Sequence, residues 1–441
     1  MNYPKNQDFN HHVGRGVFII LPFLPHQRCQ QEQKLSEASE LVRALGEEVI
    51  GYHSLALKKI NPATLIGKGS LDIAKQKILD VAPPKESWQT NPHLAFVYVD
   101  HALTAGQQRN VEKTLGCYIE DREGLILNIF SKRAKSDEGR LQVNMARLQY
   151  DQSRLVRSWT HLERQRGSTG NIGGPGERQI ELDKRKITDD IKKIETRLNK
   201  VIKTRHLHRK MRQKIPYPLI ALVGYTNAGK STLFNRLTGA KELAMDLLFA
   251  TLDTHVRRVA LPSKRQVIFS DTVGFISHLP THLIAAFRAT LEELEQASII
   301  IHLADISAND FVFKVNEVEK ILSQLPLPEG QKKLLVGNKY DLFKKNGHDA
   351  DLITDINVSG FYGDNIEKLL AYIDDELDKQ DDVVIKTYRL AIEDEKLPQK
   401  LYQAGRVIKD EVMNESPFYR HITVKLSRSK ASQINLPTTL S

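Results

Sequence analysis

The residues best suited to chemistry form a glycine-rich stretch, GYTNAGKS, at Gly224–Ser231. An apolar run, LIALVG, ends at its first glycine, and the helical sequence STLFNRLTG begins at its last serine. Glycines let backbone N–H groups surround phosphate oxygens, and a helix N-terminus adds partial positive charge. In this context the spacing predicts a phosphate-binding loop in which Lys230 reaches the β- and γ-phosphates and Ser231 ligates Mg²⁺. The alternative is a glycine-rich turn that carries a solvated lysine.

Two further motifs close apolar runs and predict a guanine nucleotide. In DTVG, Asp271 can hold the metal ion through water, and Gly274 can offer its N–H to the γ-phosphate. In NKYD, which begins at Asn338, Asp341 can accept hydrogen bonds from N1–H and the exocyclic amine of guanine. Adenine lacks that donor pair, so an unpaired aspartate would disfavour ATP. A later VSG, Val358–Gly360, can offer a backbone N–H to the guanine carbonyl.

The sequence LLFATLDTHVRR, between the first two motifs, should contain a threonine that closes over the γ-phosphate and Mg²⁺. Thr251 and Thr254 are both suitable, and chemistry alone does not separate them.

Phe275 follows DTVG, where many GTP-cleaving switches place a glutamine that orients water. Either Phe275 packs into the core beside Ile276, or the position is apolar because a partner or an ion completes the site. Asn227 is a candidate ligand for a monovalent cation such as potassium, and an Asx hydrogen bond within the loop is the alternative.

The elements that must position these residues alternate between strands and helices from Leu219 to about Lys379. The apolar runs LIALVG, VRRVAL, QVIFSD, SIIIHLAD and KKLLVGN are separated by helical stretches. This alternation predicts an α/β fold, a P-loop GTPase domain at residues 215–379 with a mostly parallel sheet and helices on both faces.

The flanking segments have patterns of their own. Residues 1–136 read as a small α/β subdomain, with strands GVFIIL and LAFVYVD, helices LSEASELVRALGEE and SLDIAKQKIL, and a loop from Ala82. Residues 380–441 read as a small α+β appendage, a β-α-β unit with strand VIKTYRLAI, helix LPQKLYQAGRVIKDEV and strand RHITVKL.

Residues 137–214 carry apolar side chains at steps of three, four or seven, which predicts two helices in an antiparallel hairpin. The alternative is two helices that pack separately on the α/β subdomain. The two matching stripes are Leu141, Met145, Leu148, Leu155, Trp159 and Leu162, with Gln152 in one seam position, and Ile180, Ile187, Ile191, Ile194, Leu198 and Val201.

The loop RGSTGNIGGPGER, Arg166–Arg178, joins these helices and holds five glycines and a proline in thirteen residues. That composition excludes a helix and suits either a flexible linker or a tip presented to a partner, with arginines for phosphate. The second helix ends in KTRHLHRKMRQK, Lys203–Lys214, with six basic residues and no acidic one. Cations suit a helix C-terminus, but this excess points to nucleic acid.

The composition of the 441-residue chain is that of a soluble globular protein with more than one domain, and its net charge of +10 favours an anionic partner. The cysteines Cys29 and Cys117 form no disulfide framework, which points to a reducing compartment, the cytoplasm. No apolar run near the start is long enough for a transmembrane segment or arranged as a signal peptide.

The motifs GYTNAGKSTLFNRLTG, LFATLD, DTVGFI and NKYD together resemble the HflX family of translational GTPases. Stretches outside the GTPase segment, such as NPATLIGKGSLDIA, DREGLILNIFSKRAKSDEGRLQV and GGPGERQIELDKR, resemble the N-terminal domain of that family. The resemblance covers about residues 15–375.

The resemblance implies a protein that binds the 50S subunit and 70S ribosomes, contacts 23S rRNA through the hairpin loop and basic helix, and splits stalled or idle ribosomes. We also expect the protein to be monomeric. It implies GTP hydrolysis that ribosomal particles stimulate, Lys230, Thr251 and Gly274 as catalytic residues, and Ser231 and Thr251 as the Mg²⁺ ligands. The predicted nucleotide-site residues are Gly224, Tyr225, Thr226, Asn227, Ala228, Gly229, Lys230, Ser231, Thr232, Phe249, Ala250, Thr251, Leu252, Asp253, Asp271, Thr272, Val273, Gly274, Asn338, Lys339, Tyr340, Asp341, Val358, Ser359 and Gly360.

Three positions depart from the family pattern. Gly173 stands where the family usually has an arginine before GPGE, Arg178 where it has a threonine after it, and Thr254 where a proline commonly follows ATLD. Two other functions fit the same motifs: an RNA-binding assembly or scaffold protein whose nucleotide only gates affinity, and a GTPase for tRNA modification or ribosome biogenesis.

Overall fold

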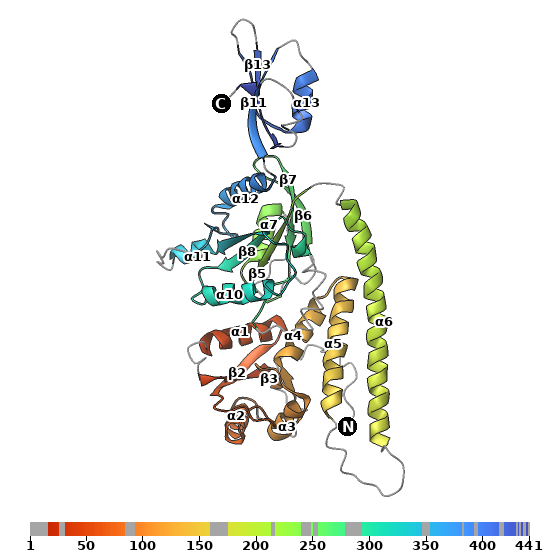
Figure 1. Ribbon diagram of the computed structural model, residues 1–441. Helices are drawn as coiled ribbons and strands as arrows, with labels where there is room; N and C mark the ends of the chain where they lie inside the picture. Colours follow the sequence, from red (N-terminus) through yellow and green to blue (C-terminus); the bar gives the residue numbers. More distant parts are fainter. Residues whose placement is uncertain are drawn as a thin grey trace. The chain divides into compact units, whose positions relative to one another are not determined.

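The computed structural model contains three sheets, and the chain falls into two compact units (Figure 1). The first unit comprises Met1–Arg258 and Ile268–Asp364, and the second comprises Val259–Val267 and Asn365–Ser441. The residues that the structure describes are 16–25, 31–83, 93–158, 175–212, 217–239, 248–249, 255–277, 293–345, 353–381, 383–391, 396–413, 419–428, 431, 434 and 438–439.

The N-terminal subdomain has a parallel sheet in the order β2-β1-β3-β4. Every residue of β1 is buried, as in a strand covered on both faces. Its strands are β1 (Gly16–Phe23), β2 (Glu48–Ala56), β3 (Leu94–Val99) and β4 (Ile119–Asp121), and its helices are α1 (Gln31–Ala44), α2 (Lys68–Val81), α3 (Ala105–Leu115) and α4 (Arg122–Arg133).

One expectation for this subdomain is wrong. The helix predicted to continue to Glu48 ends at Ala44, and Glu48 begins strand β2. Gly46 adopts a positive φ of 86°, a conformation that ends helices. Strand β2 lies at the sheet edge and is mostly only half-buried, so it lacks the continuous apolar run of its neighbours. The loop predicted from Ala82 lies mostly outside the described residues.

The helical hairpin consists of α5 (Asp137–Ser158) and α6 (Pro175–Arg212), which lie side by side and run in opposite directions (Figure 1). Ile191 and Leu198 of the predicted seam are buried, and the Gln152 amide donates a 3.0 Å hydrogen bond to the Thr188 hydroxyl. No helix in the described part of the chain is both long and apolar enough to span a membrane.

The predicted loop Arg166–Arg178 extends too far, because α6 already begins at Pro175. Proline is well tolerated in the first turn of a helix, where its missing N–H needs no partner. The preceding residues, 159–174, are outside the described ranges, and so are Trp159 and Leu162 of the predicted seam.

The predicted GTPase sheet has six strands in the order β10-β9-β8-β5-β7-β6, and β5 pairs in parallel with both β7 and β8. This confirms the α/β fold that the sequence predicts. The strands are β5 (Leu219–Gly224), β6 (His255–Ala260), β7 (Gln266–Asp271), β8 (Ile299–Asp305), β9 (Lys332–Asn338) and β10 (Ile356–Asn357), and the helices are α7 (Lys230–Thr238), α10 (Phe311–Leu322), α11 (Tyr340–Lys345) and α12 (Ile366–Gln380).

The C-terminal segment has an antiparallel sheet in the order β12-β13-β11-β14. The predicted helix is too long: α13 ends before Gly405, and Arg406–Met413 forms a strand instead. Ile408 and Val412 are four residues apart, a spacing that fits the period of a helix and that of a strand, so it did not exclude a helix. The elements are β11 (Val383–Ala391), α13 (Lys396–Ala404), β12 (Arg406–Met413), β13 (Tyr419–Ser427) and β14 (Thr438–Thr439).

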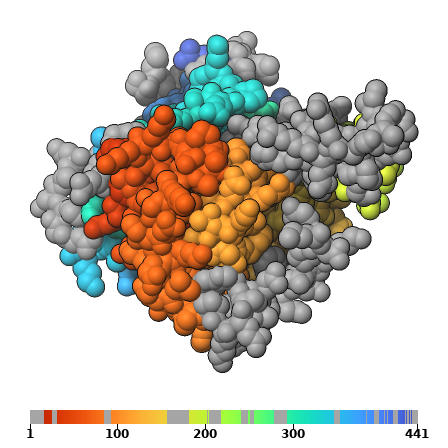
Figure 2. All heavy atoms as spheres, turned by 90° about the horizontal axis from the view of Figure 1, so that it is seen from below, coloured from red at the N-terminus to blue at the C-terminus, as the bar shows by residue number. Residues whose placement is uncertain are grey.

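Buried side chains form separate cores on the two faces of the N-terminal sheet. One core, which includes Phe130, also takes in residues from the predicted nucleotide site, among them Tyr225, Phe249 and Val273. Figure 2 views the N-terminal end of the molecule and shows the α/β subdomain and the first hairpin helix as adjoining surfaces. The division into four domains at residues 136, 214 and 379 stays a prediction.

Candidate functional site

The predicted phosphate-binding loop turns from β5 into α7 as its sequence requires. Asn227 and Gly229 have positive φ angles of 62° and 84°, which asparagine and glycine tolerate best. The Lys230 Nζ is buried and donates hydrogen bonds to the carbonyls of Gly224 at 3.1 Å and Tyr225 at 2.8 Å. Burial lowers the pKa of Lys230 to about 8, although Asp271 opposes that shift. The lysine therefore lies folded along the loop.

Ser231 and Asp271 meet at the predicted metal position. The Ser231 hydroxyl donates a 3.0 Å hydrogen bond to Asp271 Oδ2, and Asp271 is buried at the end of β7. A hydroxyl and a carboxylate provide the oxygen donors that Mg²⁺ prefers, with phosphate oxygens and water as further ligands. The residues present therefore fit the ion. The described residues contain no cluster of three His, Cys, Asp or Glu that would bind a metal without a nucleotide.

The DTVG segment lies directly on the phosphate loop. A Cβ built on Gly274 would be 2.9 Å from Thr226 Cγ2 and 3.0 Å from Lys230 Nζ, so only glycine fits there. The neighbouring Phe275 accepts a hydrogen bond from the Thr226 N–H at 2.7 Å and donates its own N–H to the Gly224 carbonyl at 3.1 Å.

The side chain of Phe275 is buried in the same cluster as Ile276, as the core-packing alternative predicts. It therefore presents no polar group to a water molecule at the γ-phosphate position. Thr272 also has a structural contact, because its hydroxyl donates a 2.6 Å hydrogen bond to the Leu222 carbonyl. Val273 is buried beside it.

Asn338 joins three of the predicted segments. Its Nδ2 donates to the Ala228 carbonyl of the phosphate loop at 2.8 Å, and its Oδ1 accepts from the Gly360 N–H at 2.9 Å. A Cβ on Gly229 would be only 2.3 Å from Asn338 Nδ2. NKYD, VSG and the phosphate loop therefore form one connected site.

The predicted guanine-reading residues are held by their own contacts. The Ser359 hydroxyl donates a 2.6 Å hydrogen bond to Asp341 Oδ1, and the Lys339 Nζ pairs with Asp305 Oδ2 at 2.8 Å. The Tyr340 N–H donates to the Val358 carbonyl at 3.2 Å, which aligns the two segments. This arrangement can present a carboxylate to the base edge, and the roles themselves stay predictions.

Part of the predicted site lies outside the described residues. Thr251, with its neighbours 250 and 252–254, belongs to that part. Phe249, just before it, is described: it is buried, has a φ of 56°, and packs edge-to-face on Phe130 of α4 with ring centroids 4.6 Å apart. Within the described residues, the Asn227 side chain has no hydrogen bond, so the Asx alternative finds no partner there.

No motif or periodicity predicts the contacts that Tyr225 makes at this site. The hydroxyl of Tyr225, in the phosphate loop, donates a 3.1 Å hydrogen bond to Glu37 of α1 and accepts the Ser277 N–H at 2.8 Å. Arg122 of α4 reaches the same serine. The Tyr225–Glu37 and Arg122–Ser277 contacts join residues more than 150 positions apart, which neither periodicity nor motif spacing can reveal.

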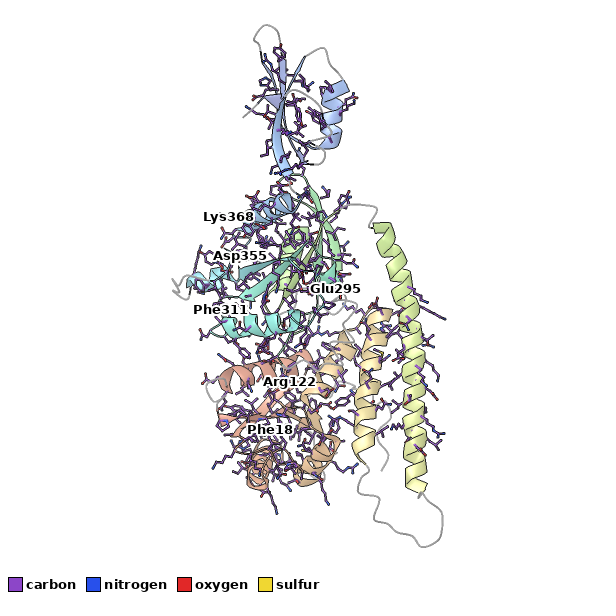
Figure 3. All side chains as sticks on the ribbon, in the orientation of Figure 1. Phe18, Arg122, Glu295, Phe311, Asp355 and Lys368 are labelled. Carbon is purple, nitrogen blue, oxygen red and sulfur yellow. The ribbon has the colours of Figure 1, made fainter. Side chains whose placement is uncertain are left out.

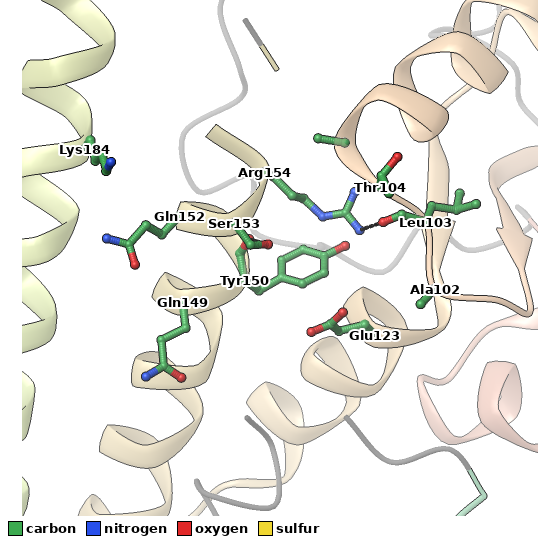
Figure 4. Close-up of a pocket in the computed structure, with 11 residues that line it drawn as sticks. Ala102, Leu103, Thr104, Glu123, Gln149, Tyr150, Gln152, Ser153, Arg154 and Lys184 are labelled. Atoms are coloured by element: carbon green, nitrogen blue, oxygen red, sulfur yellow. Dashed lines mark hydrogen bonds between the residues drawn. The ribbon is translucent and has the colours of Figure 1, made fainter. Parts of the chain in front are cut away.

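A separate cavity of about 690 Å³ lies where α5 packs near the starts of α3 and α4 (Figure 4). Arg154 crosses it, stacks on the Tyr150 ring at 4.1 Å and pairs with Asp121 at 2.6 Å. Glu123 and Lys184 also line it, and burial raises the pKa of Glu123 to about 7. None of the predicted nucleotide residues lines this cavity.

Three family models match successive parts of the chain. The model described as GTP-binding GTPase N-terminal matches residues 32–131, and the GTP-binding GTPase Middle Region matches residues 133–212. The model described as 50S ribosome-binding GTPase matches residues 219–339, which contain the phosphate loop, DTVG and the first two residues of NKYD.

Curated relatives match over most of their length. A protein of Magnetococcus marinus named GTPase HflX is 45% identical over 79% of this chain and 78% of its own. Proteins of the same name from Caldanaerobacter subterraneus subsp. tengcongensis and Escherichia coli are 41% and 37% identical, over 87% and 90% of this chain and 85% and 90% of their own.

Proposed function

The chain belongs to the HflX family of GTPases and hydrolyses GTP, and on that premise we propose that it binds the 50S ribosomal subunit and splits or rescues stalled or idle 70S ribosomes. The observation that carries the proposal is the match of residues 219–339 to the model described as 50S ribosome-binding GTPase, and the apolar Phe275 beside Gly274 is compatible with it. A GTPase site with an apolar side chain at this position needs its water-orienting group from elsewhere, and a ribosomal particle can supply it.

In the proposed reaction, the nucleotide contacts come from residues of the phosphate loop, DTVG and NKYD. Lys230 moves from the loop carbonyls to the β- and γ-phosphates and regains full positive charge there. Gly274 offers its N–H to the γ-phosphate, and Asp341 reads the guanine edge. Because Asn338 joins the phosphate loop to Gly360, binding of the base and binding of the phosphates reinforce each other.

Ser231 and Thr251 would ligate Mg²⁺, and Asp271 would hold it through water. The ion would neutralise charge on the phosphate oxygens. The Asn227 side chain, which has no described hydrogen-bond partner, would be open to potassium at the edge of the loop.

We assign ribosome binding to the basic arm of the chain. The hairpin carries the glycine-rich loop between α5 and α6 and the six basic residues of Lys203–Lys214. Such a segment would contact rRNA phosphates, and the net charge of +10 suits that partner.

GTP turnover measured with and without purified 50S subunits and 70S ribosomes tests the proposal. We expect a stimulation of about 10-fold or more, and its absence with both particles would contradict it. Sucrose gradients of 70S ribosomes with a slowly hydrolysed GTP analogue should show free subunits, with Lys230→Ala as the control. Co-sedimentation without subunit release would favour the scaffold or biogenesis alternative.

A further inference from the structure

A buried polar cluster joins the N-terminal subdomain to the GTPase site. At its centre is Arg122, the first residue of α4, whose side chain is 9% exposed (Figure 3). Its Nη1 donates to Asp100 at 2.5 Å, and its Nη2 donates to Glu37. The same Nη2 also donates to the carbonyl of Ser277 at 3.0 Å and to its hydroxyl at 3.1 Å. One guanidinium therefore binds two carboxylates and the chain that follows DTVGFI.

Glu37 completes the cluster from α1. Its carboxylate accepts the Ser277 hydroxyl at 2.9 Å and the Tyr225 hydroxyl at 3.1 Å, and the Tyr225 oxygen in turn accepts the Ser277 N–H at 2.8 Å. Each of these hydroxyl donors thus has an acceptor. Tyr225 is the second residue of the phosphate loop, and Ser277 is three residues beyond Gly274. The N-terminal subdomain consequently fixes both segments that face the phosphates.

The Asp100–Arg122 pair of this cluster is held ionised. Burial alone would raise the pKa of Asp100, but the charge of Arg122 and hydrogen bonds from Tyr98 and Arg122 lower it below its ordinary value. The carboxylates in turn raise the pKa of Arg122 although burial acts to lower it. A charged, hydrogen-bonded pair away from water tolerates little change in geometry, which makes it a firm support.

Helix α4 also contacts Phe249, in the LLFATLDTHVRR segment that contains Thr251. Phe130, two turns beyond Arg122 on α4, packs on Phe249, which directly precedes the segment that contains Thr251. Helix α4 therefore contacts both nucleotide-facing segments: the one that contains Thr251, through Phe249, and the one that contains DTVG, through Ser277.

We propose that Arg122 and Glu37 are positioning residues for GTP hydrolysis: they anchor Ser277 and Tyr225 so that Gly274 stays over Lys230, where the γ-phosphate binds. This rests on the role proposed above for Gly274, but it requires no ribosome. Because GDP lacks the γ-phosphate, the anchor favours GTP over GDP and supports turnover, while it contributes little to GDP binding.

Four full-length variants test the proposal without ribosomes. Arg122→Gln removes the guanidinium, Ser277→Ala and Tyr225→Phe each remove one hydroxyl, and Arg147→Gln is the control. Arg147 bonds Asn128 and pairs with Asp151 within the same subdomain and hairpin, away from the nucleotide site. The measurements are kcat, KM, and the affinities for fluorescent GDP and a non-hydrolysable GTP analogue.

We expect the first three variants to lower kcat and the ratio of triphosphate to diphosphate affinity by about 2- to 30-fold, with GDP affinity within about twofold of the parent. The double variant of Arg122→Gln and Ser277→Ala should raise the activation free energy by less than the sum of the two single effects, because both changes remove the same contact between Arg122 and the Ser277 hydroxyl. Should Arg122→Gln not fold, the two hydroxyl variants still decide the matter.

Equal losses of GTP and GDP affinity would show that the cluster is only a structural support, and would overturn the proposal. A kcat and a ratio of triphosphate to diphosphate affinity that both stay unchanged would overturn it as well. Both readouts are independent of ribosome stimulation, so a failure of ribosome binding leaves the test intact.

Discussion

The amide nitrogen of Asn338 occupies the space that a Cβ on Gly229 would need, at a distance of 2.3 Å. The two residues belong to motifs more than one hundred positions apart, and Gly229 is itself in the left-handed region with a φ of 84°. The contact explains why a glycine precedes Lys230 and why an asparagine opens NKYD. It also makes the loop sensitive to a single methyl group.

We expect Gly229→Ala to weaken GDP and GTP binding by about 10-fold or more, because the methyl group displaces Asn338 from both the Ala228 carbonyl and the Gly360 N–H. Fluorescent-nucleotide titration measures the change. Gly69→Ala is the control, since a Cβ there meets no atom within 4 Å. Wild-type affinity in Gly229→Ala would show that the loop adapts and that the contact is not needed.

The pKa of Lys230 predicts how nucleotide affinity depends on pH. Burial holds this pKa at about 8 in the nucleotide-free protein, below the ordinary value of 10.5. Phosphate should raise it, so above pH 8 binding must be accompanied by proton uptake. The affinity should then fall with rising pH, by at most about tenfold per pH unit between pH 8 and 9, and stay level between pH 7 and 7.5.

Calorimetry in buffers of different ionisation enthalpy would detect that proton uptake. Lys230→Arg is the matched variant, because arginine stays charged throughout this range and its affinity should not share the decline. A parallel decline in both proteins would assign the pH dependence to another group.

Phe275→Gln should not create a faster GTPase. The side chain points into the core rather than toward the phosphates, and a glutamine there would bury an amide and leave unfilled space. We expect the free energy of unfolding to fall by about 3 kcal/mol or more, and GTP turnover in the absence of ribosomes not to rise. Phe361→Gln, at a site that is 68% exposed, should change stability by less than about 0.5 kcal/mol. A stable and faster Phe275→Gln protein would refute the core assignment.

Replacing residues 167–173 with a glycine-serine sequence of equal length tests the hairpin loop. Because α6 begins at Pro175, this change leaves the helix intact. Stimulation by 50S subunits should be lost while GTP turnover without ribosomes stays within about twofold of the parent. Gln152→Ala, which removes a seam contact to Thr188, serves as a control for altered hairpin packing. Full stimulation in the loop variant would make the loop a linker only.

The strands that carry the motifs were predictable because they are buried on both faces. Leu219–Gly224 and Lys332–Asn338 appear in the sequence as continuous apolar runs, and the structure places strands there. Strand β2 was missed because an edge strand that is half-exposed has no such run. Strand β12 was assigned to a helix because its apolar residues Ile408 and Val412 are spaced in a way that fits both a helix and a strand.

The nucleotide motifs were similarly visible, since backbone geometry around phosphates demands glycine at particular positions. The cluster of Glu37, Arg122 and Ser277 was not visible. Its members have no fixed spacing, and Arg122 and Ser277 are 155 positions apart. An arginine that follows a buried strand is as easily a surface residue, and only the packing of α4 shows otherwise.

Asp121 and Arg122 are consecutive yet bind different parts of the protein. The Asp121 carboxylate accepts the Tyr150 hydroxyl at 2.8 Å and pairs with Arg154, both on α5, whereas Arg122 binds Ser277. Only one peptide group separates Asp121 from Arg122, so no flexible segment lies between them. A tilt of α5 would therefore displace the nucleotide site as well. The contacts of Asp121 with α5 and of Arg122 with Ser277 therefore form a rigid connection between the hairpin and the nucleotide site.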